Sequence, residues 1–471
     1  MSDLCFLPAT EMARLIRAKK LSARELLDAH LNQIERVNPK VNAIVTSIPE
    51  QAAARANAAD EHAVHGRFLG PLHGLPIAHK DLVDTKGIRT TYGSPIFRDN
   101  VPEQDALIVD RIRDAGAILI GKTNTPEFGA GSQTFNPVFG ATRNPYDLTK
   151  TCGGSSGGAA VALACGMLPL ADGSDMGGSL RNPASFCSVI GFRTSPGRVP
   201  IVPSLGSPWQ ALSVLGPMAR TVADTALLLS VMAGPDPRSA MSLDDPGSRF
   251  AEPVDAKLTS KRIAWCPGLS GAVFENRVTD VFDRHRRTFE QLGCVVEEAQ
   301  PDLTDADEIF RVWRAATFYS RFADLLAQYP TEVKDTVIQE IERGRRLTVS
   351  DLARADTAWS RLLERIGQFM SRYDYWVLPT VQVAPFDVNQ PYPSEIERVT
   401  MESYIDWMRS CYYVTVTALP AISVPAGFTP EGLPVGLQIV GGHHDDLGVL
   451  RIAHAFEQAN RSVRRVPPAA L

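Results

Sequence analysis

Two glycine-framed serine segments and one lysine are the residues of this sequence best suited to nucleophilic chemistry. The first segment, residues 153–158, reads Gly-Gly-Ser-Ser-Gly-Gly, and in the second Ser179 follows two glycines. A serine hydroxyl is a weak nucleophile until a neighbouring base accepts its proton. No histidine lies near either segment in the sequence, so Lys80, just after a short apolar run, is the candidate base. A free lysine has a pKa of about 10.4, and burial against apolar walls would lower that pKa.

Residues 116–123 form a competing motif, because they match the glycine–lysine pattern of phosphate-binding loops. In such a loop the residues between the glycines wrap around phosphates, and a helix follows. Here the intervening residues are Ala-Ile-Leu-Ile, which favours a buried strand, and the following Asn-Thr-Pro starts no regular helix. We therefore do not expect nucleotide binding.

Residues 153–157 also match the Gly-x-Ser-x-Gly pattern of the nucleophile elbow in α/β-hydrolases. That elbow needs a strand directly before the serine, together with a histidine base. Residues 147–152 are polar and turn-like, and nothing marks any of the downstream candidates as a base: His443, His444 and His454. A serine esterase of the α/β-hydrolase type is the weaker alternative. Each serine taken singly is also compatible with an ordinary loop residue.

Taken together, Lys80, the double-serine segment and Ser179 resemble the amidase signature family, and the resemblance covers nearly the whole chain. The 24-residue spacing from Ser155 to Ser179 is that of the family, and segments 419–426 and 432–440 extend the likeness. The resemblance implies a Ser-Ser-Lys catalytic triad without metal or cofactor. Ser179 would be the nucleophile, Ser155 a relay serine on a cis peptide bond, and neutral Lys80 the base. Ser179 would form an acyl-enzyme, release ammonia or an amine, and give the acid after attack by water.

The same resemblance assigns the substrate contacts. The backbone N–H groups that align with the oxyanion hole are those of Met176, Gly177, Gly178 and Ser179. Glycine suits this role because the backbone must approach the substrate with no Cβ atom between them. Met176 departs from the threonine or isoleucine common in the family, so the hole should persist while the pocket wall changes. Gly129 aligns with a substrate-contacting position, whereas Asp175 and Arg181 predict a structural ion pair.

The elements that must position these residues alternate between helices and strands. Capping residues predict one helix after Ser22 and another after Thr221, and residues 129–158 and 172–205 predict long loops. Strands are predicted at 75–78, 117–120, 262–265, 295–298, 375–378, 421–424 and 436–440. The fully apolar run 117–120 suits a sheet covered on both faces. The composition indicates an α/β protein, and the resemblance adds one large mixed β-sheet with helices on both faces.

The 471 residues suffice for one enzyme with a large core and a pocket beside it. The resemblance implies a single domain with a core of residues 1–235 and 372–471 and a more helical part, about 255–371, over the site. A net charge of -5 gives no basic face for nucleic acid, and no apolar stretch is long enough to span a membrane. The seven scattered cysteines favour a reducing cytoplasm. The expected partner is a small-molecule amide, and a homodimer stays open.

Two functions fit the resemblance. The first is a free-standing amidase of the acylamide, aryl-amide or carbamate type. The second is the A-type component of a tRNA-dependent amidotransferase, which releases ammonia from glutamine for a partner. Segment 405–413 is more aromatic than a glutamine pocket requires, which favours the first. We expect an apolar or aromatic amide, and the aromatic residues that could line its pocket or fill the core are Trp313, Phe318, Tyr319, Trp376, Trp407 and Tyr412.

Overall fold

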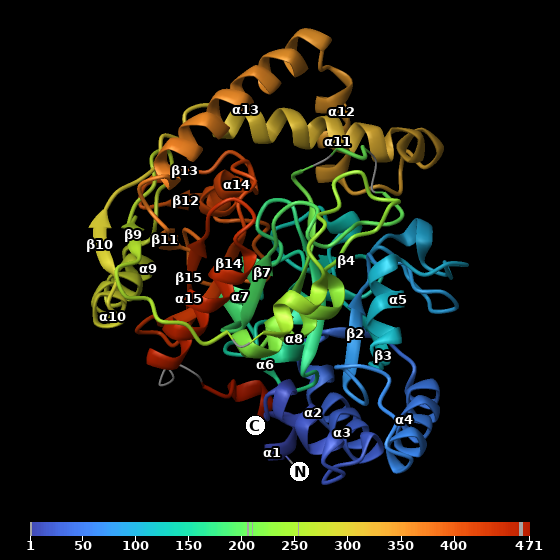
Figure 1. The fold of residues 1–471 in the computed structure, drawn as a ribbon. Coiled ribbons are helices and arrows are strands. Elements are labelled where there is room, and N and C mark those ends of the chain that lie inside the picture. Colours follow the sequence, from blue (N-terminus) through green and yellow to red (C-terminus); the bar gives the residue numbers. More distant parts are fainter. Residues whose placement is uncertain (1, 205–206, 210, 253, 461–464) are drawn as a thin grey trace.

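Strands from both halves of the chain build one mixed β-sheet at the centre of the protein (Figure 1). The computed structural model describes residues 2–204, 207–209, 211–252, 254–460 and 465–471. Within these residues the sheet has 11 strands in the order β1-β3-β2-β6-β8-β7-β14-β15-β11-β9-β10. Pairing is parallel from β3 through β2 to β6 and from β11 through β9 to β10. The other neighbours are antiparallel, so the predicted mixed sheet is confirmed.

The strands of this sheet are β1 (Ile44–Ser47), β2 (Pro76–Lys80), β3 (Ile118–Thr123), β6 (Leu170–Asp175), β7 (Ile190–Arg193), β8 (Val214–Ala219), β9 (Arg262–Trp265), β10 (Val295–Glu298), β11 (Tyr375–Pro379), β14 (Ala421–Phe428) and β15 (Pro434–Val440). Two short ladders lie outside it: β4 (Phe135–Asn136) with β5 (Gly140–Ala141), and β12 (Glu395–Ile396) with β13 (Val399–Thr400). All seven predicted strands are present, each within a few residues of its expected position.

The helices before residue 235 are α1 (Ser2–Cys5), α2 (Ala9–Arg17), α3 (Ala23–Val41), α4 (Pro49–Val64), α5 (Leu107–Asp114), α6 (Gly157–Ala164), α7 (Arg181–Cys187) and α8 (Val222–Met232). Those after it are α9 (Asn276–Asp283), α10 (Arg286–Gln291), α11 (Ala306–Gln328), α12 (Asp335–Arg345), α13 (Val349–Met370), α14 (Arg409–Thr415) and α15 (Asp446–Ala459). Short 3-10 helices span η1 (Pro95–Phe97), η2 (Glu127–Gly129), η3 (Gly247–Ala251), η4 (Asp406–Met408) and η6 (Pro468–Ala470). Ser22 and Thr221 cap α3 and α8 as predicted.

Helices bury both faces of the sheet. Along β11, Tyr375 and Val377 belong to a core shared with α8, α9 and α15. Trp376 and Leu378 belong to a second core, shared with α11, α13 and α14. Because successive side chains of a strand point to opposite faces, a strand covered on both sides is apolar at every position. This explains the continuous apolar runs and confirms the predicted layers.

Helices α11, α12 and α13 lie together at one end of the sheet, in yellow and orange at the top of Figure 1. The residues just before them add two strands to the sheet, with Val295 of β10 pairing parallel to Arg262 of β9, as the predicted β-α-β unit requires. Phe310 of α11 is buried in the core on β11. Phe318 and Phe322, farther along α11, pack instead against Phe128, which follows β3. Helix α11 therefore bridges the sheet and the loops near Lys80.

The predicted loop at 172–205 is wrong, because it contains most of β6, all of α7 and all of β7. Strand β6 lies in the interior of the sheet although it ends in Asp-Gly-Ser-Asp. Its polar groups are paired: Asp172 accepts the backbone N–H of Lys80 (2.8 Å), and Asp175 binds Arg181 (2.9 Å). Buried charged side chains are tolerated where they are hydrogen-bonded. The polar residues of β6 therefore indicate a candidate functional site within the sheet and not a loop.

The two competing motifs have the structures that sequence analysis assigned to them. Gly121 and Lys122 lie inside strand β3, so this segment forms no phosphate-binding loop. No strand directly precedes Ser155, whereas helix α6 does follow it, so the nucleophile-elbow geometry is absent from this described segment.

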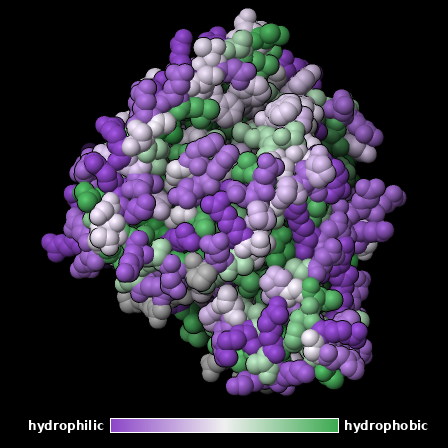
Figure 2. Space-filling view, viewed as in Figure 1, coloured by the Kyte–Doolittle hydropathy of each residue, from purple (hydrophilic) through white to green (hydrophobic). Residues whose placement is uncertain are grey.

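Over the face shown in Figure 2, hydrophilic and hydrophobic residues are interspersed. None of the described helices is both long enough and apolar enough to cross a membrane.

Candidate active site

The ammonium group of Lys80 lies at the centre of a cluster of serine hydroxyls. Lys80 ends strand β2, and its side chain is fully buried. Its Nζ donates hydrogen bonds to Ser155 Oγ (2.7 Å), Ser156 Oγ (2.9 Å) and Ser174 Oγ (3.1 Å). The structure therefore brings together the predicted Lys80 and Ser155. It adds Ser174 of β6, which sequence analysis missed because it took that strand for a loop.

Burial controls the charge of this lysine. It lowers the pKa of Lys80 to about 7, against the opposing effect of the negative charges of Asp172 and Asp175. Asp172 lies on the neighbouring strand, where Oδ1 accepts the backbone N–H of Lys80 and Oδ2 lies 2.6 Å from Nδ1 of His79. The carboxylate thus fixes the backbone of the lysine while its three ammonium donors contact only hydroxyl groups. This lowering of the pKa favours the neutral form of Lys80.

The peptide bond between Gly154 and Ser155 is cis, as the resemblance implied. The glycines next to this peptide bond are in close contact with neighbouring backbone and side-chain atoms. A Cβ atom on Gly157 would lie 2.2 Å from Oγ1 of Thr134, and one on Gly158 would lie 2.3 Å from the amide nitrogen of Asn124. Larger residues at these positions would force the double-serine segment away from Lys80.

Ser179 lies in the loop between β6 and α7, beside the double-serine segment. Its carbonyl oxygen accepts the backbone N–H of Ser156 at 3.1 Å, which ties the two segments together. Ser155 and Ser179 line the same cavity, together with Gly129 and Met176. Within the described residues no hydrogen bond joins the hydroxyls of Ser155 and Ser179.

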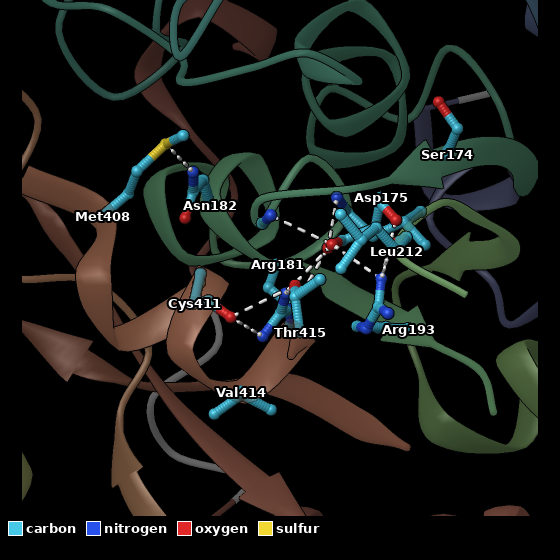
Figure 3. Close-up of polar contacts among 12 residues, drawn as sticks. Ser174, Asp175, Arg181, Asn182, Arg193, Leu212, Met408, Cys411, Val414 and Thr415 are labelled. Atoms are coloured by element: carbon cyan, nitrogen blue, oxygen red, sulfur yellow. Dashed lines mark hydrogen bonds and ion pairs between the residues drawn. The ribbon is translucent and has the colours of Figure 1, made fainter. Parts of the chain in front are cut away.

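The loop that carries Ser179 is anchored by a buried carboxylate (Figure 3). Asp175 forms ion pairs with Arg181 (2.9 Å) and Arg193 (3.4 Å), and all three side chains are fully buried. Burial alone would raise the pKa of Asp175, but the two guanidinium groups outweigh it and hold this pKa well below its usual range. The predicted ion pair between Asp175 and Arg181 is confirmed, and Arg193 completes it.

The same carboxylate engages one of the four N–H groups that the resemblance assigned to the oxyanion hole. The N–H of Gly178 donates to Oδ1 of Asp175 at 2.9 Å, so it is already used within the protein. The N–H groups of Met176, Gly177 and Ser179 have no hydrogen-bond partner among the described residues. Position 178 requires glycine for two reasons. Its φ is +121°, which other residues rarely adopt, and a Cβ atom there would lie 2.6 Å from Cβ of Cys411.

A cavity of about 360 Å³ opens beside the serines and is mainly apolar. Besides the serines, its wall includes Leu82, Tyr92, Phe97, Phe128, Phe318, Arg321, Phe322 and Leu325. Four of these residues, 318, 321, 322 and 325, share one face of α11, because positions three, four and seven apart align on a helix. This periodicity is the signal that could have identified the pocket from sequence.

Of the six aromatic residues considered for the pocket, only Phe318 lines this cavity. Trp376, Trp407 and Tyr412 are buried in the core, and Trp313 packs against that core. Tyr319 is 42% exposed. The expectation that most of the six belong to the core is therefore confirmed.

An α/β fold with several serines in the wall of an apolar cavity, two of them hydrogen-bonded to a buried lysine, has the architecture of a serine-dependent hydrolase. Residues 25–450 match the model of the Amidase family. The chain belongs to this family and is an amidase, a hydrolase of carboxylic amides.

Its relatives include an acylamidase of Rhodococcus erythropolis, 38% identical over 460 residues that cover 97% of this chain and 96% of that protein. The A-type component of the glutamyl-tRNA(Gln) amidotransferase of Alkaliphilus metalliredigens is 31% identical, over 95% of each chain. The solved structure of a bacterial aryl acylamidase of the amidase signature family superposes with a TM-score of 0.90 at 28% identity. That alignment covers 97% of this chain and 96% of the other. The predicted family and fold are thus confirmed.

The buried ion-pair network gives a prediction about stability. Replacing Arg193 by Met leaves part of the negative charge of Asp175 unpaired in the interior, so the free energy of unfolding should fall by about 3 kcal/mol. Chemical denaturation followed by tryptophan fluorescence measures this change. Arg262→Met is the matched control, because it breaks an exposed ion pair with Glu297 and should cost less than about 1 kcal/mol. Equal losses in the two variants would contradict the assigned role of the network.

Proposed function

We propose that this chain is a free-standing amidase that uses Ser179 as nucleophile, Ser155 as proton relay and Lys80 as base. The contact of 2.7 Å between Lys80 Nζ and Ser155 Oγ, in surroundings that lower the lysine pKa to about 7, carries this proposal. The position of Ser179 in the same cavity wall supports it.

In the proposed first step, neutral Lys80 accepts a proton from Ser155 while Ser155 accepts one from Ser179. Ser179 Oγ then attacks the amide carbonyl carbon. The negative charge that develops on the carbonyl oxygen is stabilised by the free N–H groups of Met176, Gly177 and Ser179. Gly178 keeps the loop narrow enough for this approach, and Gly129 keeps the opposite wall clear.

The C–N bond breaks when the proton returns through Ser155 to the leaving nitrogen. Ammonia or an amine departs, and the acyl group stays on Ser179. Water then attacks the acyl carbon and gives a proton to the relay. The bond from the acyl carbon to Ser179 Oγ breaks, the relay returns the proton to Ser179 Oγ, and the carboxylic acid is released. Each cycle consumes one amide and one water and restores neutral Lys80, so neither metal nor redox cofactor enters it.

A free-standing amidase is preferred over an amidotransferase component. The acylamidase relative is more similar to this chain than the amidotransferase relative, at 38% against 31% identity. The aromatic wall of the cavity also fits an apolar or aromatic amide better than the polar glutamine side chain. We place the enzyme in the cytoplasm, which the seven free, buried cysteines support. Its partner is a small-molecule amide.

The triad is tested by three substitutions, assayed with an anilide. Ser179→Ala should lower kcat/KM by at least about 10⁴-fold, because it removes the nucleophile. Lys80→Ala should do nearly as much, and Ser155→Ala somewhat less, since water can partly replace a relay hydroxyl. Ser360→Ala is the control, because its hydroxyl bonds only a carbonyl oxygen within α13. Full activity of Lys80→Ala would refute the relay.

The pH dependence of kcat/KM tests the state of the base. Lys80 acts when neutral, so activity should rise with pH, with a midpoint near 7. The negative charge of Asp172 raises this pKa, so Asp172→Asn should move the midpoint downward by about one unit. Asp84→Asn removes a cavity carboxylate that does not act on Lys80, and should leave the midpoint in place. An upward shift in Asp172→Asn would rule out Lys80 as the titrating group.

A further inference from the structure

Arg321 of α11 is a cation in the cavity wall without a counter-charge. It lines the same cavity as Ser155 and Ser179, and its side chain is partly buried. Within the described residues it forms neither an ion pair nor a hydrogen bond. The other buried arginines of this helix are paired: Arg311 with Asp307 (2.7 Å) and Arg314 with Glu340 (2.5 Å).

Neither of the two carboxylates in the described cavity wall forms an ion pair with Arg321. Asp84 accepts a hydrogen bond from the hydroxyl of Tyr92 (2.5 Å), and Asp175 is held by its two arginines. Burial lowers the pKa of Arg321 to about 10, and no neighbouring charge opposes this effect. Among the described residues, Arg321 thus has no anion within ion-pair distance, and aromatic side chains lie in the same cavity wall.

The geometry of Arg321 leaves its hydrogen-bond donors available. Its guanidinium carbon lies 4.8 Å from the ring centre of Phe322, within the range of a cation–π contact. None of its N–H donors is used among the described residues, so they are available to bind both oxygens of a carboxylate. Phe322 in turn contacts Phe128 and Phe318, which continue the apolar wall.

We propose that Arg321 binds a carboxylate on the substrate, carried by an apolar or aromatic part whose amide carbonyl reaches Ser179. This inference rests on the proposed function and narrows its substrate class to amides that carry an acid group. The aromatic wall would cover the apolar part, and the guanidinium group would pair with the anion in a site of reduced dielectric. Free glutamine fits less well, because it has no apolar or aromatic part to contact the aromatic side chains of the cavity.

The inference is tested by comparing acids with their neutral esters. Suitable substrates are 4-acetamidobenzoate, with the carboxylate on the amine side, and glutaric acid monoanilide, with the carboxylate on the acyl side, each beside its methyl ester. At least one acid should exceed its ester by about tenfold or more in kcat/KM. Arg321→Met should abolish this preference and leave hydrolysis of the esters within about threefold. Arg321→Lys should keep part of the preference, because it retains the charge and loses the planar pair of donors.

Arg346→Met is the matched control, since Arg346 is an exposed arginine that does not line this cavity. It should keep the full preference for the acid. Unfolding temperatures of all variants separate a binding effect from loss of structure.

A binding measurement separates this inference from the proposed reaction. Calorimetry with the Ser179→Ala variant gives the affinity for each acid and each ester without turnover. An acid that binds about tenfold more tightly than its ester, with the difference lost in Ser179→Ala/Arg321→Met, supports the inference even if no amide is hydrolysed. Hydrolysis of the esters with no preference for either acid overturns the inference and leaves the amidase proposal intact. Glutamine as the preferred substrate would also overturn it.

Discussion

The burial of one lysine among serine hydroxyls is the constraint on which the site depends. Lys80 is buried at the end of a strand inside the sheet, and its ammonium group contacts Ser155, Ser156 and Ser174. A carboxylate in direct contact would hold the lysine in its charged form, whereas hydroxyls satisfy its donors and leave it free to lose a proton. Asp172, whose negative charge acts most strongly on Lys80, binds the backbone of Lys80 instead. This separation is what the proposed role of Lys80 as a base requires.

The surrounding sheet and loops bring the serines to this lysine. Parallel pairing of β2 and β6 sets Lys80 beside the strand that carries Ser174, and the loop after β6 then carries Ser179. Asp175 holds that loop through the N–H groups of Gly178 and Leu180, while its charge is balanced by buried arginines. One carboxylate thus shapes the loop that carries Ser179.

The sequence allowed prediction of the features that depend on a local residue pattern or on the combination of Lys80 with the two serine segments. The apolar strands, the helix caps at Ser22 and Thr221, and the association of Lys80 with Ser155 are all present. Strand β6 was missed because its polar residues are stabilised by partners far away in the chain, which no local pattern reveals. The hydrogen bond from the Gly178 N–H to Asp175 spans only three residues, but it was missed because the segment was taken for an irregular loop. The face of α11 that lines the pocket could have been recognised from the spacing of its residues. The proposed role of Arg321 depends on its lack of an acidic partner among the described residues, which only the structure shows.

The central claim is that Lys80 acts through Ser155 on Ser179, so that the serine nearest the lysine is not the one that is acylated. Rapid acid quenching during turnover of a slow anilide, followed by peptide mass spectrometry, identifies the residue that carries the acyl group. The account predicts the acyl group on Ser179 in the wild type and in Ser155→Ala, where the adduct forms more slowly. An acyl group on Ser155 in the wild type would contradict it.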